Sequence, residues 1–243
     1  MRIALISDIH GNKIALQAVL DNVAKEGVDR LFFLGDVATL GPDPVGAIEL
    51  LHDQNCLCIL GNHDEFMFDS NLAETYTEAD EILTAIDWCR DQLSADHLDF
   101  LRSFKPLLPV ELNENQELLL FHGSPRSHME VILATTGADD LDEIFSGYDA
   151  QILIGGHTHL QMIRQHRGKL IVNPGSVGSP FVEFVQGTPK LLPDAEYAIV
   201  ESTNEGITVS LKRVSLDRRA LIRAAEASDT PMREWLISQY RSW

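Results

Sequence analysis

The stretch Ile3-Ala4-Leu5-Ile6-Ser7-Asp8-Ile9-His10 begins as an aliphatic run and ends on an acid and a histidine. A short aliphatic run that stops at polar turn residues is typical of a buried strand. Apolar residues then recur from Leu16 to Val23 at the spacing of one helix face, and this pattern ends near Gly27. The opening of the chain therefore predicts a strand, Ile3 to Ser7, followed by a turn and a helix.

The same unit recurs further along the chain. A second strand is expected from Leu31 to Leu34, before Gly35-Asp36, and a helix with Pro44 in its first turn runs to Leu51. A third strand is expected from Leu57 to Leu60. Strands that alternate with helices indicate an α/β fold with a parallel core. Later strands are expected at Leu118–Phe121, Ile152–Ile154, Leu170–Val172, Tyr197–Glu201 and Ile207–Val214.

The composition excludes several classes of protein. The chain has 243 residues, 44% of them apolar, and a formal net charge of −18. A chain of this length buries roughly 70% of the surface that its unfolded form exposes, so it needs no disulfides for stability. Extended nucleic acid is an unlikely partner, because its binding draws most of its affinity from Lys and Arg that neutralise phosphates. We expect one soluble domain over residues 1–243.

The cysteines and the N-terminus indicate a compartment. Cys56, Cys58 and Cys89 form an odd set, and the first two lie two residues apart in an apolar run, which does not suit a disulfide framework. The first apolar stretch is far too short for a signal-peptide core, and no later stretch approaches the length of a membrane span. We therefore expect a reduced, cytoplasmic protein that does not associate with membranes.

An acidic segment separates the third and fourth expected strands. From Asp64 to Asp99 it holds eleven Asp or Glu and one Arg, which is more than half of the net charge of the chain. It contains no glycine, and its apolar spacing predicts helices. We expect a helical cap inserted at 65–109, which either is a solvated face or covers the site. A second helical segment is expected as the C-terminal tail, 216–243.

Histidine, aspartate and asparagine side chains gather where the expected strands end. In open α/β sheets ligands bind outside the carboxyl ends of the strands, so these separate segments are expected to converge on one site. The candidate residues are Asp8, His10, Asp36, Asn62, His63, His122, His157 and His159.

The chemistry of this set points to metal ions. Carboxylates, imidazoles and an amide oxygen, without cysteine, suit divalent ions such as Mn²⁺, Fe²⁺ or Zn²⁺. A catalytic ion keeps about three protein ligands and an open position, so the set is too large for one ion and fits two. Asp36 stands alone after its strand and is the natural carboxylate to bridge two ions about 3.5–4 Å apart.

The order of these motifs resembles the five motifs of the calcineurin-like metallophosphoesterase superfamily. The matching segments are Asp8-x-His10, Gly35-Asp36, Gly61-Asn62-His63-Asp64, His122 and Gly156-His157-Thr158-His159. The last of them, followed by Asn173-Pro174-Gly175-Ser176, resembles the compact bacterial and archaeal phosphodiesterase branch. The resemblance spans roughly residues 1 to 180 and implies a four-layer αββα sandwich with two packed mixed sheets.

The resemblance also implies a role for each residue. It places Asp8, His10, Asp36 and His159 on a first metal, and Asp36, Asn62, His122 and His157 on a second. Mn²⁺ is the expected ion, with Fe²⁺, Zn²⁺ or Ni²⁺ as alternatives. A hydroxide that bridges the two ions would attack phosphorus, and His63 would protonate the leaving group as general acid. Asn62 and His63 are also expected to contact the substrate.

One departure from the superfamily pattern bears on the substrate. Its protein Ser/Thr phosphatases continue the second motif as Gly-Asp-x-x-Asp-Arg-Gly, where the Asp orients the acid histidine and the Arg holds phosphate. This chain has Thr39 and Leu40 in place of those two residues. Arg126 is a candidate substitute for the cationic contact, with a solvated surface position as the alternative. The departure favours a small phosphodiester or phosphomonoester as substrate.

Three readings of the function follow. The first is a small-molecule phosphodiesterase, and the second is a phosphomonoesterase, a phosphoprotein phosphatase or a dinucleoside-polyphosphate hydrolase. The third is a non-catalytic scaffold like the retromer subunit that resembles this branch, although the intact His63 argues against it. The aromatic residues Trp235, Tyr240 and Trp243 predict a helix docked on the core or on a second subunit, so a homo-oligomer is a possible partner state.

Overall fold

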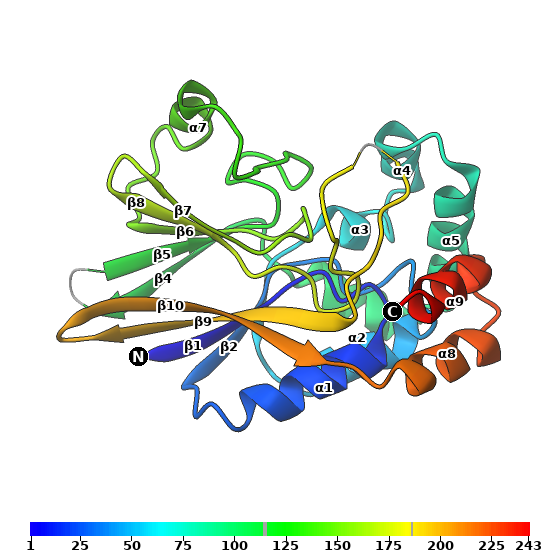
Figure 1. The fold of residues 1–243 in the computed structure, drawn as a ribbon. Coiled ribbons are helices and arrows are strands. Elements are labelled where there is room, and N and C mark those ends of the chain that lie inside the picture. Colours follow the sequence, from blue (N-terminus) through cyan, green and yellow to red (C-terminus); the bar gives the residue numbers. More distant parts are fainter. Residues whose placement is uncertain (114–115, 186) are drawn as a thin grey trace.

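Two five-stranded mixed sheets form the centre of the computed structural model, which describes residues 1–113, 116–185 and 187–243 (Figure 1). The strands of the first sheet follow the order β10 (Gly206–Ser215), β9 (Asp194–Thr203), β1 (Arg2–Ile6), β2 (Arg30–Phe33) and β3 (Leu57–Cys58). Those of the second follow the order β4 (Leu108–Asn113), β5 (Gln116–Leu120), β6 (Ile152–Ile154), β8 (Lys169–Asn173) and β7 (Met162–His166).

Alternation along β1 shows why the sheets stack between helices. Ile3 and Leu5 pack into an apolar cluster that also holds side chains of β5 and β6 in the second sheet. Ala4 and Ile6 point to the opposite face, where they meet the apolar faces of α1 (Lys13–Val23) and α2 (Pro44–His52). Successive side chains of a strand face opposite ways, so a strand that is apolar throughout is buried on both faces.

The outer face of the second sheet carries the fourth layer. Leu119 of β5 and Leu153 of β6 pack there against Leu141 and Ile144 of α7 (Ala138–Ile144). The expected four-layer αββα sandwich of two mixed sheets is therefore confirmed. The parallel core that the periodicity indicated is also present, since β1, β2 and β3 run parallel, as do β5, β6 and β8.

The edge strands are where the sequence prediction fell short. The third strand is only Leu57–Cys58, and Ile59 continues as an isolated bridge to Lys105. Neither β4 nor β7 was expected. Both are antiparallel edge strands with polar, partly exposed residues, and β4 contains Pro109, which an edge strand tolerates. Such strands lack the continuous apolar runs that mark the inner strands, because only one of their faces is buried.

Helices occupy the acidic segment, as predicted. They are α3 (Asn62–Glu65), α4 (Ser70–Tyr76), α5 (Asp80–Arg90) and α6 (Ala95–Arg102). In α5 the residues Ala85, Ile86 and Cys89 are buried, while Ile82 and Leu83 are partly buried against the same cluster. The apolar face that the spacing predicted is therefore the face that packs on the core, and the acids of α5 point to solvent.

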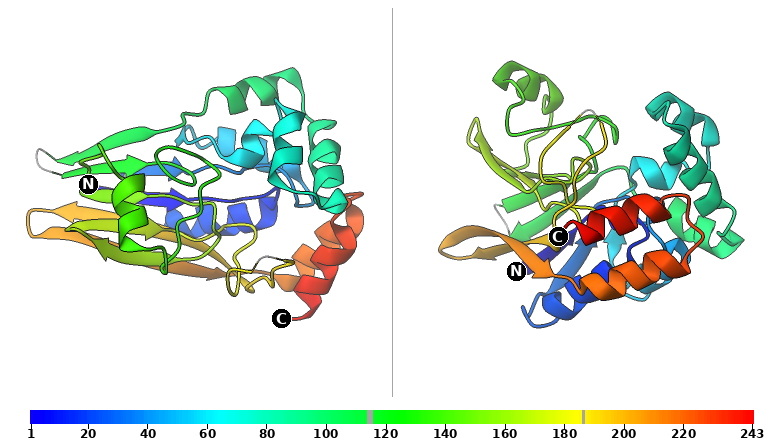
Figure 2. Two further views of the ribbon diagram at one scale, coloured as in Figure 1. Left: turned by 90° about the horizontal axis from the view of Figure 1, so that it is seen from above. Right: turned by 45° about the vertical axis from the view of Figure 1, so that its right-hand side comes forward.

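The C-terminal tail forms two helices, α8 (Arg218–Ala227) and α9 (Arg233–Arg241), which lie side by side in both views of Figure 2. Tyr240 is 1% exposed in a cluster with Leu191 and Leu221, so the tail docks on its own chain. Among the residues described, no helix combines the length and the apolar character that crossing a bilayer requires.

Candidate metal centre

The carboxyl ends of five strands bring the candidate residues together. Asp8 and His10 follow β1, Asp36 follows β2, and His157 and His159 follow β6. Asn62 begins α3 just after β3, and His122 follows β5 by two residues. Because β1 to β3 belong to one sheet and β5 and β6 to the other, the site lies where the ends of both sheets meet. The expected convergence is present.

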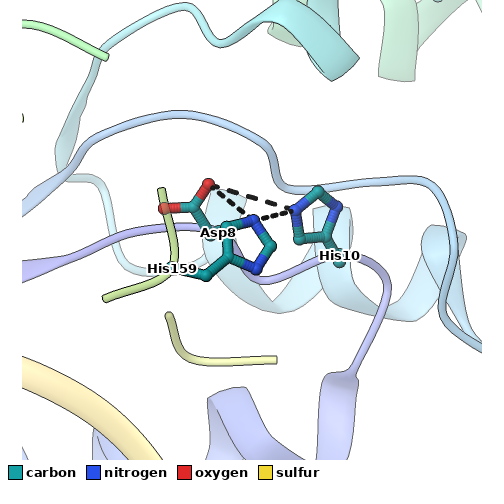
Figure 3. A group of neighbouring side chains, drawn as sticks. All are labelled: Asp8, His10 and His159. Atoms are coloured by element: carbon teal, nitrogen blue, oxygen red, sulfur yellow. Dashed lines mark hydrogen bonds and ion pairs between the residues drawn. The ribbon is translucent and has the colours of Figure 1, made fainter. Parts of the chain in front are cut away.

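Asp8, His10 and His159 form a first group of potential ligands (Figure 3). His159 Nε2 lies 3.3 Å from Asp8 Oδ1 and 3.0 Å from His10 Nε2. His159 Nδ1 donates to the carbonyl oxygen of Ser179 at 2.7 Å, which leaves a lone pair on Nε2. Asp8 Oδ1 is buried, and no described residue donates a hydrogen bond to it. These donor atoms face one another in the manner of ligands that share an ion.

Asp36, His122 and His157 form a second group. His122 Nδ1 donates to the Leu34 carbonyl oxygen at 2.6 Å, so Nε2 again presents a lone pair. That atom lies 3.3 Å from Asp36 Oδ2 and 3.2 Å from Asn62 Oδ1. A lone pair and two oxygens at such distances repel one another unless a proton or a metal ion lies among them, and Asn62 thus joins this group.

Asp36 lies between the two groups. Its Oδ2 is 3.3 Å from His122 Nε2 in the second group and 3.8 Å from His10 Nε2 in the first. Its Oδ1 accepts the backbone N–H of His63 at 2.9 Å, which fixes the carboxylate in place. A carboxylate in this position can contact an ion in either group.

The local backbone is shaped around the ligands. Positive φ angles are rare for residues other than glycine and cluster at functional sites. Gly61 is required on packing grounds, because a Cβ there would lie 2.1 Å from Asp36 Oδ1. Five of the seven potential ligands have left-handed backbones, with φ of 55° at Asp8, 47° at His10, 66° at Asp36, 68° at His157 and 58° at His159.

The charge balance of the site favours bound cations. Asp8 and Asp36 are at most 1% exposed, so water screens their charges little. Burial lowers the pKa of His122, but the carboxylates of Asp36 and Asp8 outweigh that effect and raise it to about 10. A site that draws a proton onto a buried imidazole this strongly is one in which positive charge is stabilised. Nitrogen and oxygen donors in two groups around one carboxylate fit two divalent ions.

His63 stands beside the two groups and in neither of them. Its ring centre lies 5.1 Å from that of His10, and its Nδ1 lies 3.0 Å from Thr39 Oγ1. Thr39 also contacts His10 Nδ1 at 3.3 Å. Thr39 stands where the protein phosphatases of the superfamily have an acid, and it contacts the histidine in place of that acid, a role that the sequence pattern did not predict. Its position three residues after Asp36 was the available signal.

Asp64 supports the ligands from behind. Its carboxylate accepts the backbone N–H groups of Asp36, Val37 and Gly61 at 2.8 to 2.9 Å. Burial and the charge of Asp36 raise its pKa to about 7, while these three donors favour the ionised form. Asp64 thus holds the segments after β2 and β3 together.

Arg126 has other partners. Its guanidinium pairs with Glu130 at 2.6 Å and Glu143 at 2.8 Å, and 42% of its side chain is exposed. This arrangement matches the surface position considered as an alternative. Contact with a substrate phosphate stays a prediction for this residue.

Comparison with known proteins places the fold and the site in one family. The calcineurin-like phosphoesterase superfamily domain matches residues 1–203. The chain belongs to this superfamily. This calcineurin-like phosphoesterase is 32% identical over 193 residues to an uncharacterized protein of Methanocaldococcus jannaschii, covering 73% of this chain and 76% of the relative. It is 30% identical over 183 residues to phosphodiesterase YfcE of Escherichia coli K12, covering 74% and 81%.

The chain is also similar to a more distant relative and to two solved structures. Symmetrical bis(5'-nucleosyl)-tetraphosphatase of Erwinia tasmaniensis is 28% identical over 144 residues, or 58% of this chain and 50% of that protein. A metallophosphoesterase of Sphaerobacter thermophilus superposes with a TM-score of 0.75 and 27% identity, covering 99% of both chains. A hypothetical protein of Pyrococcus horikoshii superposes with a TM-score of 0.81, covering 98% of this chain and 96% of that chain. At 20% identity this likeness shows the fold alone. The protein is a metal-dependent phosphoesterase.

Proposed function

We propose that this phosphoesterase hydrolyses small phosphodiesters at two divalent metal ions, with His63 as the general acid. The observation that carries the proposal is the position of Asp36, which lies between two groups of buried donors and also binds the backbone of His63. One carboxylate thus links both candidate ion positions to the candidate acid.

The two groups of donor atoms suggest how the ligands divide between two metal ions. Bound divalent ions lower the pKa of water toward ~7 and offset charge on the phosphoryl oxygens. Mn²⁺ is our choice, because the donors are imidazole, carboxylate and amide. Asp8, His10, His159 and Asp36 would hold one ion, and Asp36, Asn62, His122 and His157 would hold the other.

His63 is arranged to give a proton to the leaving oxygen. Thr39 occupies its Nδ1, so Nε2 is the atom left to exchange a proton with substrate. Burial lowers the pKa of His63, and the charge of Asp36 opposes this by favouring the protonated form that a general acid requires. The hydrogen bond from its backbone N–H to Asp36 keeps the acid at a fixed place beside the metal groups.

The substrate class follows from what the site offers to phosphate. The segment after Asp36 has no arginine, and Arg126 is paired with two glutamates. A diester has one negative charge on phosphorus and needs less cationic help than the dianion of a monoester. The 30% identity to phosphodiesterase YfcE supports the same choice, and the tetraphosphatase relatives support dinucleoside polyphosphates as the second candidate.

The test is a substrate comparison on Mn²⁺-loaded protein. Bis-p-nitrophenyl phosphate, p-nitrophenyl phosphate and diadenosine tetraphosphate are compared by kcat/KM, with chelator-treated protein as control. We expect the diester to be turned over fastest and the chelated protein to be inactive. Faster cleavage of the monoester or the tetraphosphate would replace the first candidate. Failure to cleave any of them with both ions bound would favour the scaffold reading.

The cellular setting is also proposed. All three cysteines, Cys56, Cys58 and Cys89, are free thiols, which is typical of cytoplasmic proteins. The cytoplasmic location and a homo-oligomeric state stay predictions.

A further inference from the structure

An exposed tyrosine stands next to the candidate acid. Tyr76 is the last residue of α4, and its ring centre lies 5.5 Å from that of His63, with the two planes at 81°. On another side the ring lies 5.5 Å from the fully buried ring of Phe66. Phe66 and His63 are themselves in edge contact at 5.0 Å. The rings of His63 and Phe66 therefore hold Tyr76 at the edge of the metal centre.

Tyr76 keeps a large free surface in spite of these contacts. It is 41% exposed, which makes it one of the few large apolar side chains open to solvent, whereas Phe66 is 0% and His63 4% exposed. Partial burial, followed by the charges of Asp36 and Asp8, raises the pKa of Tyr76 to about 12, so the phenol stays neutral. An uncharged aromatic side chain thus stays partly open to solvent beside an otherwise ionic site.

The ring on the other side of the histidines does not offer such a face. Phe181 lies 4.3 Å from the ring of His159, with a 31° angle between planes. Phe181 is only partly exposed and packs against the apolar cluster of the C-terminal helices, which includes Leu221 and Tyr240. Its role is to hold His159 against the core. None of the apolar clusters formed by the described residues includes Tyr76.

The position of Tyr76 beside the acid defines what it can touch. If His63 protonates the leaving oxygen, the organic group on that oxygen lies next to His63 and hence next to Tyr76. We propose that Tyr76 binds the leaving group of the substrate by ring contact and selects phosphate esters whose leaving group carries a planar ring, aryl or nucleoside. This rests on the proposed function for the identity of the acid.

Binding of stable phosphonates tests the contact without turnover. Methylphosphonate, phenylphosphonate and a nucleoside 5′-phosphonate share one head group and differ in the attached group. Each is titrated by calorimetry into Mn²⁺-loaded wild type, Tyr76→Ala and Tyr76→Phe. Ring contacts of this kind contribute about 5- to 30-fold in affinity. We expect Tyr76→Ala to lower the affinity for at least one ring-bearing ligand by that factor and to change the affinity for methylphosphonate by no more than about 2-fold. Tyr76→Phe should bind every ligand nearly as tightly as wild type.

A matched variant and a parallel assay separate the explanations. Tyr148→Ala removes a partly buried tyrosine that packs on the α7 side of the second sheet, and it should leave the affinity for every ligand unchanged. If Tyr76→Ala loses affinity for phenylphosphonate alone, the preferred leaving group is an aryl group. If it loses affinity for the nucleoside ligand alone, the preferred leaving group is a nucleoside. The inference would be overturned if Tyr76→Ala lost affinity equally for methylphosphonate and the ring-bearing ligands, or if it lost affinity for none of them. Bis-p-nitrophenyl phosphate turnover by the same wild-type preparation tests the proposed function separately.

Discussion

The strand-end cluster of metal-site residues and the helices α4 to α6 are both acidic, but their charges are held in different ways. In the cluster, Asp8 and Asp36 are at most 1% exposed and face imidazole nitrogens 3.3 Å away. On the helices, the side chains of Asp87 and Asp99 are 60% and 74% exposed and pair with arginines three residues further on. The helices carry more acids, yet only the cluster has the geometry of a site.

The difference teaches that the burial of a carboxylate, more than the number of acids in a region, makes it suited to hold a cation. An exposed acid is stabilised by water, and its ion pair contributes about 0.2–1 kcal/mol. A buried carboxylate loses that hydration and must be compensated by cations or donors. Removing single charges from each region should therefore have effects that differ by orders of magnitude.

The largest effect is expected at the carboxylate between the groups. Asp36→Asn keeps the shape but removes the charge that both ions would share, so we expect kcat to fall by at least about 10⁴-fold, the result of losing several kcal/mol of charge stabilisation. Elemental analysis should show fewer than two bound ions per chain. Full occupancy of both positions in the folded variant would contradict the bridging role.

Next is the acid beside the cluster. His63→Ala should lower kcat by about 10² to 10⁴-fold, the usual contribution of a general acid, without loss of metal. Substrates with a good leaving group such as p-nitrophenolate should suffer least, because they need protonation least. Loss of metal from this variant would show instead that His63 is a ligand.

A smaller effect is expected behind the ligands. Asp64→Asn removes one acceptor oxygen from the three backbone N–H groups that order the segments after β2 and β3. Metal affinity should fall by about 10- to 100-fold, as for other residues that orient ligands, and excess Mn²⁺ should restore much of the activity. Activity that stays low at saturating Mn²⁺ would point to a direct catalytic role.

A buried acid outside the cluster should make stability depend on pH. Glu196 of β9 is 1% exposed, and burial raises its pKa to about 7 despite the pairing with Arg213 at 3.0 Å. Because the folded pKa is raised, its stabilising contribution is full below about pH 4.5 and is lost as the pH rises through about 7, by up to about 1.4 kcal/mol per unit.

Glu196→Gln removes this titration. The free energy of unfolding of wild type minus that of the variant, measured with urea in chelator, should therefore decrease between about pH 5 and 8. A difference that is flat across this range would mean that the carboxyl of Glu196 titrates normally in the folded chain.

The smallest effect is expected on the acidic helices. Asp99→Asn breaks the exposed pair with Arg102 and should change the free energy of unfolding by no more than about 0.5 kcal/mol, with kcat/KM unchanged. Thermal unfolding and the diester assay measure both quantities. A clear fall in kcat/KM would show that the acidic helices act on the substrate, as the cap reading holds.

Much of the candidate site was predictable because the signal is local. The motifs Asp8-Ile9-His10 and Gly156-His157-Thr158-His159 each mark the end of an apolar strand and also supply candidate metal ligands at that end. Parallel strands direct such ends to one edge, so convergence followed from pattern alone. The partners Thr39 and Tyr76 were not predicted, because each meets His63 only after α3 and α4 have folded against the segment after β2.

By itself the sequence determined the strand–helix rhythm, the potential ligands and the helical nature of the acidic segment, since these depend on spacing along the chain. Only the tertiary structure decided that β4 and β7 complete the second sheet, that Arg126 pairs with Glu130 and Glu143, and that Asp36 lies between two donor groups. Edge pairing, ion pairing and the meeting of donors depend on contacts between distant segments, and no local pattern encodes those contacts.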